Sequence, residues 1–372
     1  MTTKSFDVSK FRKSLTKSIP GISTGFNDPK IWISTGNYAL NFLLTSDFNK
    51  GIPLGKVTMF AGESGSGKSF IASGTIARNA QEMGIYVVLI DSENALDKTW
   101  LEALGVDTDE SKLLRISASM IDDVAKIMSD FVTEYKKEHA DKPEDDRPKV
   151  LFIIDSLGML LTPTDVNQFQ AGEMKGDMGR KAKQLKALVT NCVNMLGDMQ
   201  IGLVCTNHTY ASQDMFDPDD KISGGSGMVF AASLVIAMKK RKLKEDEDGN
   251  KVSDVLGIKS DCKVVKTRYS KPFESVKINI PYETGMDPIS GLFDLFEKTG
   301  VLVKDGNRYK YTVKADGTEM KYFRKEWNDY EKLKVIMDEF SQDDIQAIGE
   351  FTDDDDDSED VDGKMVVLGK KR

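Results

Sequence analysis

Short apolar runs alternate with amphipathic stretches through the middle of the chain. The apolar runs lack polar alternation, as expected of parallel strands that are buried on both faces, and they lie at 56–61, 85–90, 150–154 and 201–205. Apolar residues recur at helical spacing at 69–83, 121–137 and 180–199, and further strand candidates are 234–238, 261–265 and 276–280. The pattern predicts an α/β fold with a doubly wound, mostly parallel sheet, whose sites lie at the carboxyl ends of the strands.

The two ends of the chain fall outside this alternation. Residues 1–30 are expected to form a small N-terminal arm, because Phe6, Phe11 and Leu15 can share one helical face before Pro20 interrupts the pattern. The core is then expected to span 31–290, followed by a small mixed C-terminal appendage at 291–337 and a tail at 338–372.

The tail changes how the net charge of −9 is interpreted. The stretch 338–362 holds 13 acidic residues and no Lys or Arg, so the rest of the chain carries +4. The run Asp353–Asp357 repels itself and is expected to be disordered. The tail either solubilises the protein or competes with DNA for a basic surface or recruits partner proteins.

The composition predicts a cytoplasmic protein. The longest apolar stretch, 229–238, is too short to cross a bilayer, and the N-terminus lacks the apolar segment of a signal peptide. Cys192, Cys205 and Cys262 have no metal-binding spacing, and we expect them to be buried thiols in a reducing compartment.

The most specific motif is an uninterrupted match to the phosphate-loop pattern G-x-x-x-x-G-K-[ST]. It reads Gly62-Glu63-Ser64-Gly65-Ser66-Gly67-Lys68-Ser69 and joins an apolar run to a helical segment, which is the setting the pattern needs. We expect Lys68 to reach the β- and γ-phosphates of ATP and Ser69 to ligate Mg²⁺. The alternative is a chance match in a Gly-Ser loop.

Polar residues follow three of the predicted strands. Asp155 ends an apolar strand, which is the arrangement that holds Mg²⁺ in triphosphate enzymes. Glu93 follows another strand and is a candidate base for the attacking water, although a Glu beside a helix N-terminus is a structural alternative. His208 follows a third, where it either senses the γ-phosphate or is structural.

Two long, glycine-bearing segments, 162–179 and 210–227, leave the same edge of the predicted sheet. We expect both to be loops, either functional or merely mobile lids. Apolar side chains in them could wedge between bases while cations meet phosphates; the candidate DNA contacts are Met174, Lys175, Arg180, Met215, Phe216, Gly224 and Gly225.

Taken in order, these segments resemble the RecA family of homologous recombinases. The matching motifs span 51–327 and are 91–97 with 104–107, 153–157, 206–210 and 224–227. The string Asn207-His208-Thr209-Tyr210 is similar to phage members in particular, since bacterial members have glutamine after the asparagine.

The resemblance implies further roles. Glu93 becomes the catalytic carboxylate, and Asp97 and Trp100 lie near the adenine, with Tyr282 as a second contact. The two long segments become DNA-binding loops, and the arm becomes an oligomerisation element. Lys266 and Arg268 would reach the ATP of a neighbouring protomer; the alternative is a solvated strand edge.

The resemblance thus implies a DNA-dependent ATPase that uses ATP and Mg²⁺ and forms helical filaments on single-stranded DNA. It would promote homologous pairing and strand exchange with duplex DNA in recombination, repair and replication, helped by mediator and single-strand-binding proteins. The alternatives are a ring-forming replicative helicase and a non-hydrolysing ATP-binding regulator. The charged segment 134–149 and the basic cluster at 239–244 depart from the family pattern.

Overall fold

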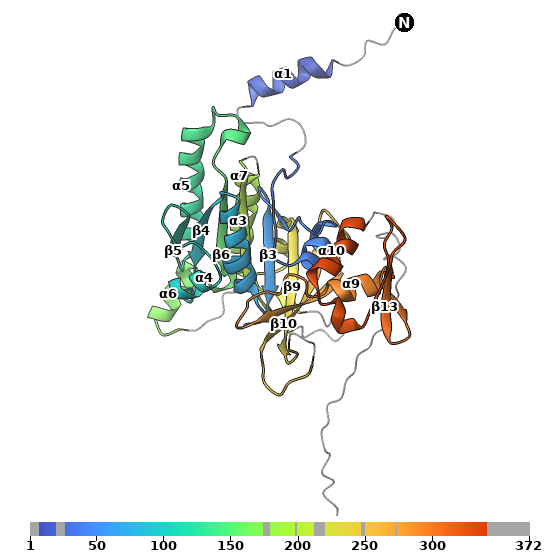
Figure 1. The fold of residues 1–372 in the computed structure, drawn as a ribbon. Helices are drawn as coiled ribbons and strands as arrows, with labels where there is room; N and C mark the ends of the chain where they lie inside the picture. The colour runs from blue at the N-terminus through green and yellow to red at the C-terminus, as the bar shows by residue number, and fades with distance from the viewer. Residues whose placement is uncertain are drawn as a thin grey trace, which may run out of the picture.

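A twisted central sheet lies between two layers of helices (Figure 1). This computed structural model describes residues 7–19, 27–173, 179–197, 199–211, 220–246, 250–272 and 274–340. The main sheet has nine strands; eight follow the order β11-β10-β9-β3-β7-β6-β4-β5, and β8 (Lys221–Ile222) pairs with β7. A mixed, mostly parallel sheet flanked by helices confirms the predicted fold class.

Six consecutive strands of the sheet run parallel to one another. They are β3 (Val57–Gly62), β4 (Tyr86–Asp91), β5 (Leu113–Ser117), β6 (Val150–Asp155), β7 (Ile201–Tyr210) and β9 (Leu234–Leu243). Successive side chains enter opposite hydrophobic clusters: in β6, Leu151 and Ile153 face one cluster, and Phe152 and Ile154 the other. Burial on both faces explains why these strands read as continuous apolar runs.

Each face of the sheet is covered by its own helices. One cluster includes residues of α2 (Tyr38–Thr45), the π-helical turn η1 (Phe70–Ile76), α3 (Ala77–Glu82) and α4 (Lys98–Ala103). The other includes residues of α5 (Ile121–His139), α7 (Arg180–Leu196) and α8 (Ser226–Ala231). The helical segments predicted from spacing are all present, with ends that differ by a few residues.

The antiparallel side of the sheet is longer than the sequence predicts. β10 (Gly257–Lys266) pairs with β9 and with β11 (Ser275–Pro281). The end of β9, from Lys239, is polar and mostly exposed, so an apolar pattern cannot reveal it. An isolated bridge between Glu245 and Lys251 extends the same ribbon.

The segment 162–179, which we expected to be a loop, begins with a helix instead. Helix α6 (Pro163–Gln170) starts at a capping box in which Thr162 and Asp165 exchange side-chain and backbone hydrogen bonds, and proline occupies its first turn. These are standard helix-start signals. The loop prediction was therefore wrong for the first half of this segment.

The C-terminal appendage packs directly on the core. It comprises α9 (Leu292–Lys298), β12 (Val303–Asp305), β13 (Arg308–Thr312), β14 (Glu319–Tyr322), η4 (Arg324–Trp327) and α10 (Tyr330–Glu339). Trp327 is fully buried, and Phe296 and Phe340 contact Phe48 in the cluster shared with α2. The appendage thus contains both helices and strands, and its hydrophobic core is continuous with one side of the central sheet.

The remaining elements are small. They are α1 (Val8–Ser18), β1 (Trp32–Ile33), β2 (Ile52–Pro53), η2 (Glu144–Asp146) and η3 (Leu157–Met159). Helix α1 is capped by Asp7, and none of its residues is buried. Phe6 and most of the acidic tail lie outside the described residues.

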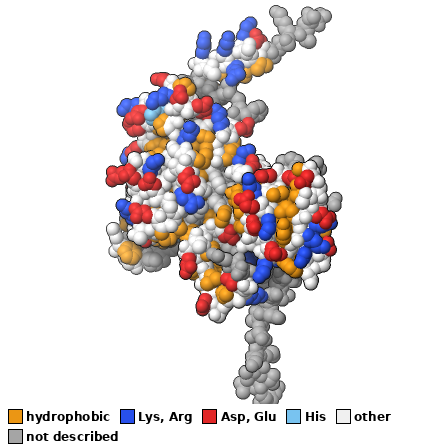
Figure 2. Space-filling model, in the orientation of Figure 1, with side chains coloured by type: hydrophobic (Ala, Val, Ile, Leu, Met, Phe, Trp, Pro, Cys, Tyr) orange, Lys and Arg blue, Asp and Glu red, His pale blue; other side chains and the backbone are white. Residues whose placement is uncertain are grey.

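The surface carries charges of both signs, and the core contains the cysteines. Lys/Arg and Asp/Glu side chains are interspersed over the face seen in Figure 2. Within the described ranges, no helix has the length and apolar character needed to cross a membrane. All three cysteines are free and buried, as predicted, and burial raises the pKa of Cys192 and of Cys262 to about 12.

Candidate functional site

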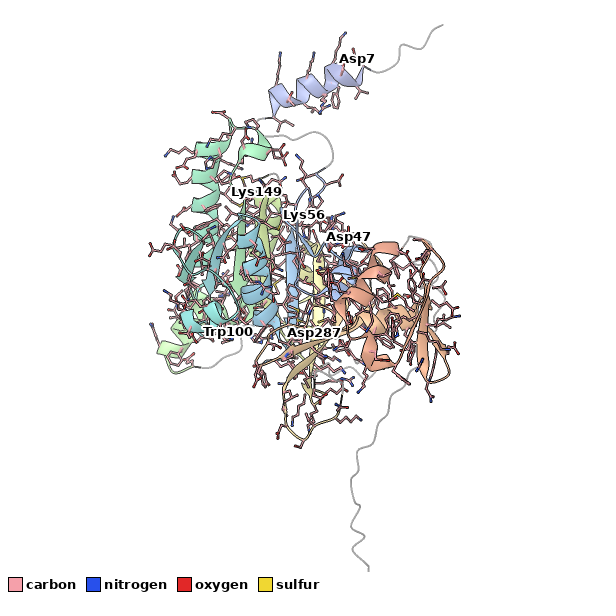
Figure 3. The ribbon with its side chains drawn as sticks, in the orientation of Figure 1. Asp7, Asp47, Lys56, Trp100, Lys149 and Asp287 are labelled. Atoms are coloured by element: carbon pink, nitrogen blue, oxygen red, sulfur yellow. The ribbon has the colours of Figure 1, made fainter. Side chains whose placement is uncertain are left out.

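The carboxyl ends of the parallel strands bring the predicted site residues together. Gly62 at the end of β3 pairs with His208 on β7, and Asp91 at the end of β4 pairs with Asp155 at the end of β6. In Figure 3, Lys56 and Lys149, which precede β3 and β6, lie at one end of the sheet and Trp100 at the other. The site therefore occupies the edge that the sequence pattern indicated.

The phosphate loop is packed tightly against the strands beside it. Gly67 has a φ of +94°, and a Cβ on it would lie 2.7 Å from Ile280 Cδ1 on β11. A Cβ on Gly62 would lie 2.4 Å from the carbonyl oxygen of Met238 on β9. Glycine is required at Gly62 by the backbone oxygen next to it, and at Gly67 by the left-handed backbone conformation, with Ile280 crowding the same side.

Lys68 lies folded across this loop. It is 6% exposed, and its Nζ donates hydrogen bonds to the carbonyl oxygens of Gly62 at 2.9 Å and Glu63 at 2.7 Å. Burial lowers the pKa of Lys68, while the negative charges of Asp155 and Glu93 oppose that shift. The Lys68 ammonium is thus held beside the backbone of the loop, where it can donate hydrogen bonds to a bound anion.

The loop's residues fit a bound triphosphate. The buried hydroxyl of Ser66 has no hydrogen-bond partner among the described residues. A phosphate oxygen could supply the missing hydrogen bond, since buried polar groups are normally paired. The glycines allow the backbone N–H groups to close around phosphate oxygens, and Lys68 supplies positive charge. Ser69 follows with helical backbone angles at the start of η1, where its hydroxyl is available to a cation.

Asp155 is held in one orientation by two buried hydroxyls. Its Oδ2 accepts a hydrogen bond from Ser73 at 2.9 Å, and its Oδ1 accepts one from Thr206 at 2.5 Å. Carboxylate and hydroxyl oxygens are the ligands that Mg²⁺ prefers, so Asp155 and Ser69 fit the predicted metal role. Sequence reasoning missed both contacts, although Thr206 begins the matching motif 206–210, because a hydroxyl inside a helix or a strand does not reveal its partner.

Glu93 and His208 meet across the site through Ser156. Ser156 Oγ donates to Glu93 Oε1 at 2.8 Å, and His208 Nε2 lies 3.2 Å from both Glu93 Oε1 and Ser156 Oγ. The Asp155–Ser156 peptide bond is cis. The predicted catalytic carboxylate and the predicted sensor are therefore in direct contact.

An ion pair between a partly exposed arginine and a buried carboxylate supports the turn that carries Glu93. Arg115 on β5 binds Asp91 Oδ2 at 2.6 Å, and Asp91 in turn accepts hydrogen bonds from the backbone N–H groups of Glu93 and Leu96. Asp91 is fully buried, so its charge is compensated by these three donors. Sequence reasoning missed Arg115 as well, since the pairing joins two neighbouring strands.

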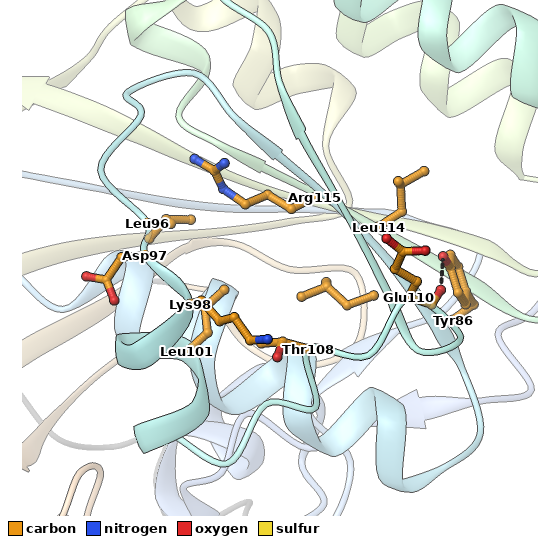
Figure 4. Close-up of a pocket in the computed structure, with 10 residues that line it drawn as sticks. Tyr86, Leu96, Asp97, Lys98, Leu101, Thr108, Glu110, Leu114 and Arg115 are labelled. Atoms are coloured by element: carbon orange, nitrogen blue, oxygen red, sulfur yellow. Dashed lines mark hydrogen bonds between the residues drawn. The ribbon is translucent and has the colours of Figure 1, made fainter.

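A cavity of about 610 Å³ lies beside this turn, between α4 and β5 (Figure 4). Arg115 and Asp97 line it from different sides, together with Lys98, Thr108 and Glu110. The cavity is lined by Asp97, one of the predicted adenine contacts, and by no residue of the phosphate loop.

Of the predicted adenine contacts, Trp100 lies against Phe70, the residue that follows the phosphate loop. Asp97 caps α4 by accepting from the Trp100 backbone N–H at 2.8 Å, and the Trp100 ring meets Phe70 edge-on at 5.7 Å. A Cβ on Gly285 would lie 3.8 Å from Phe70, so the turn after β11 is close by. Tyr282, in that turn, is 61% exposed and available for a ligand.

Lys266 and Arg268 are not brought to the phosphate loop of their own chain. Lys266 pairs with Val235 and donates to the carbonyl oxygens of Val229 and Phe230 at the end of α8. Burial lowers the pKa of Lys266, and the neighbouring Arg268 adds to the effect. Arg268 is exposed.

The described parts of the two long segments surround this edge of the sheet. Arg180 begins α7 and donates to Thr164 at 3.1 Å. Gly224 and Gly225, with φ of 85° and 81°, form the turn between β8 and α8. The other candidate DNA contacts lie outside the described residues; they are Met174, Lys175, Met215 and Phe216.

Comparison with known proteins points in the same direction. The sequence profile described as "RecA N-terminal domain" matches residues 27–287. The chain is 27% identical over 283 residues to "Protein RecA" of Phytoplasma mali, which covers 75% of the chain and 76% of the relative. It is 28% identical over 279 residues to "Protein RecA" of Nocardia farcinica (75% and 73%). It is also 28% identical over 283 residues to the "Recombination and repair protein" of Enterobacteria phage T4 (76% and 67%).

Proposed function

This chain belongs to the RecA family, and from that premise we propose that it is an ATP-dependent DNA recombinase. It forms helical filaments on single-stranded DNA and promotes homologous pairing and strand exchange, in recombination, repair and replication. The observation that carries the proposal is the convergence of Lys68, Glu93, Asp155 and His208 at one sheet edge. Base pairing within the filament, rather than the protein, reads the sequence.

The proposed hydrolysis divides the work among these side chains. Lys68 and the loop's N–H groups would hold the phosphates, and Ser69 and Asp155 would hold Mg²⁺, which would supply positive charge to the phosphate oxygens. Glu93 orients water and accepts its proton. Ser156 donates to one oxygen of Glu93, which leaves the other free for water.

His208 is proposed to report the nucleotide state to the DNA-binding segments. It contacts Glu93 on one side, and its backbone carbonyl accepts from Ser223 N at 2.9 Å on the other. Asn207 donates to the Ser223 carbonyl at 2.8 Å, immediately before Gly224. A shift of His208 toward a γ-phosphate would therefore move the end of the 210–227 segment, which supports a sensor role.

The proposal makes Lys266 and Arg268 act on a neighbour's ATP. Lys266 pairs with Val235, which pairs with Met59, three residues before Gly62. The lysine thus lies about 10 Å along the strands and about 10 Å across them from its own phosphate loop. That separation supports a contact in trans, with α1 as the arm that docks on the next subunit.

Three other assignments belong to the proposal. DNA contacts are proposed for the 162–179 and 210–227 segments, with Arg180 at the start of α7 as a phosphate contact. Mediator and single-strand-binding proteins are proposed as partners of the filament, and the bacterial cytoplasm as its location.

Single-stranded DNA is expected to stimulate the ATPase of the purified chain by at least about tenfold, because DNA orders the lattice that completes each site. Turnover is measured with and without DNA, and the same samples are viewed by negative stain. Helical filaments support the recombinase, whereas closed hexamers would favour a ring helicase. ATP binding without any DNA-stimulated turnover would favour the non-hydrolysing regulator.

A further inference from the structure

The phosphate loop touches the antiparallel side of the sheet as well as its own strand. Lys240 on β9 and Ser260 on β10 are directly opposite each other in the strand register. Both side chains point to the loop: Lys240 Nζ donates to the Ser64 carbonyl oxygen at 2.7 Å, and Ser260 Oγ donates to the Ser66 carbonyl oxygen at 2.9 Å. One cross-strand pair therefore holds two alternate carbonyls of the loop.

These contacts fix the direction of the loop's N–H groups. In a trans peptide, the C=O and the N–H of one unit point in opposite directions. Holding the Ser64 and Ser66 carbonyls toward β9 and β10 therefore directs the N–H groups of Gly65 and Gly67 away from them, toward the bound anion. Loops preorganised in this way avoid reorganisation when the ligand arrives.

The surroundings of the pair strengthen this geometry. Ser260 and Ser66 are both fully buried, so their hydrogen bond is shielded from water. Glu63 accepts from the Lys240 backbone N–H at 3.1 Å, and the Lys240 ammonium lies 3.6 Å from Glu63 Oε2. The charge of Lys240 also contributes to lowering the pKa of Lys68, behind the effect of burial, so the two ammonium groups are electrostatically close.

We propose that Lys240 and Ser260 are positioning residues of the nucleotide site, which hold the phosphate loop in its anion-binding conformation from β9 and β10. This inference rests on the proposed ATP site. It assigns a role to one member of the 239–244 cluster, which the sequence left without a purpose. Lys240 acts through the loop's backbone, whereas a lysine acting only through its charge would be interchangeable with its neighbours.

The test is nucleotide affinity in the absence of DNA. A fluorescent ADP and a non-hydrolysable ATP analogue are titrated with Mg²⁺ against the full chain, Lys240→Met, Lys240→Arg, Ser260→Ala and the double variant Lys240→Met/Ser260→Ala. Arg241→Met is the matched control, because Arg241 is adjacent in sequence and its side chain leaves the opposite face of β9. Methionine keeps much of the lysine's apolar stem and removes its charge and donor.

Lys240→Met and Ser260→Ala are each expected to raise the Kd about fivefold, the loss of one hydrogen bond. Lys240→Arg is expected to keep most of the nucleotide affinity of the unaltered chain, and Arg241→Met to keep all of it. The double variant should depart from the product of the single effects, since both act on one loop. In the ATPase, KM should rise more than kcat falls.

Wild-type affinity in both single variants would overturn the inference, as would equal losses in Lys240→Met and Arg241→Met, which would indicate charge alone. If Ser260→Ala fails to fold, the comparison of Lys240→Met, Lys240→Arg and Arg241→Met still tests whether Lys240 positions the loop. Failure of the unaltered chain to bind nucleotide is a different result, which would remove the proposed ATP site itself.

Discussion

Replacing Glu93 with glutamine is expected to lower ATP turnover on single-stranded DNA by about 10³-fold while ATP-dependent DNA binding persists. Glutamine retains an oxygen that can accept the hydrogen bond from Ser156, so the geometry around His208 is kept. It cannot accept a proton from water. Steady-state ATPase rates and the anisotropy of a labelled oligonucleotide, both with saturating ATP, measure the two effects.

The matched control is Glu82→Gln, which removes an exposed carboxylate that pairs with Arg78 on the same helix. Its turnover and DNA binding should equal those of the unaltered protein. Rapid turnover by Glu93→Gln would remove Glu93 from the mechanism and leave its contacts with Ser156 and His208 as purely structural.

The double variant Lys266→Ala/Arg268→Ala is expected to reduce DNA-stimulated turnover by about 10³-fold, as loss of an arginine finger does. Nucleotide binding by the dispersed protein should be little changed, because neither side chain lies at its own phosphate loop. Lys277→Ala, on the exposed face of β11, is the control. Turnover and nucleotide affinity are measured on the same preparations.

Mixing separates action on a neighbour from action within one chain. In a head-to-tail filament formed from equal amounts of Glu93→Gln and the Lys266/Arg268 double variant, roughly one interface in four joins an intact Glu93 to intact cations. Turnover should therefore recover to about a quarter of the unaltered rate. A mixture no more active than its parts would show that the two cations serve their own subunit or only the fold.

The sequence predicted the parts of this molecule whose physical cause is local. The parallel strands are buried on both faces, so 85–90 and 150–154 read as apolar runs whose ends carry Glu93 and Asp155. Gly62 is required by its close contact with the backbone of Met238, and Gly67 by its positive φ, and a motif preserves both requirements.

The parts that were missed depend on contacts between distant segments. Ser73 and Thr206 orient Asp155 from a helix and a strand far away in sequence, and Arg115 reaches Asp91 across neighbouring strands. The outer half of β9 is polar and mostly exposed, and the outer half of β10 mixes polar with partly buried residues, so hydrophobic pattern alone could not find them. Helix α6 is different, since its capping signals at Thr162 and Asp165 were present and were overlooked.

Strand exchange tests the proposed recombinase most directly. A circular single strand is incubated with a homologous linear duplex, ATP and Mg²⁺, and the products are separated on a gel. Joint molecules and then nicked circles are expected with the unaltered protein, only when the duplex is homologous and ATP is present, while Lys68→Ala should form none. If the protein hydrolyses ATP on single-stranded DNA but forms no homology-dependent product, it is a DNA-dependent ATPase of another kind and not a recombinase.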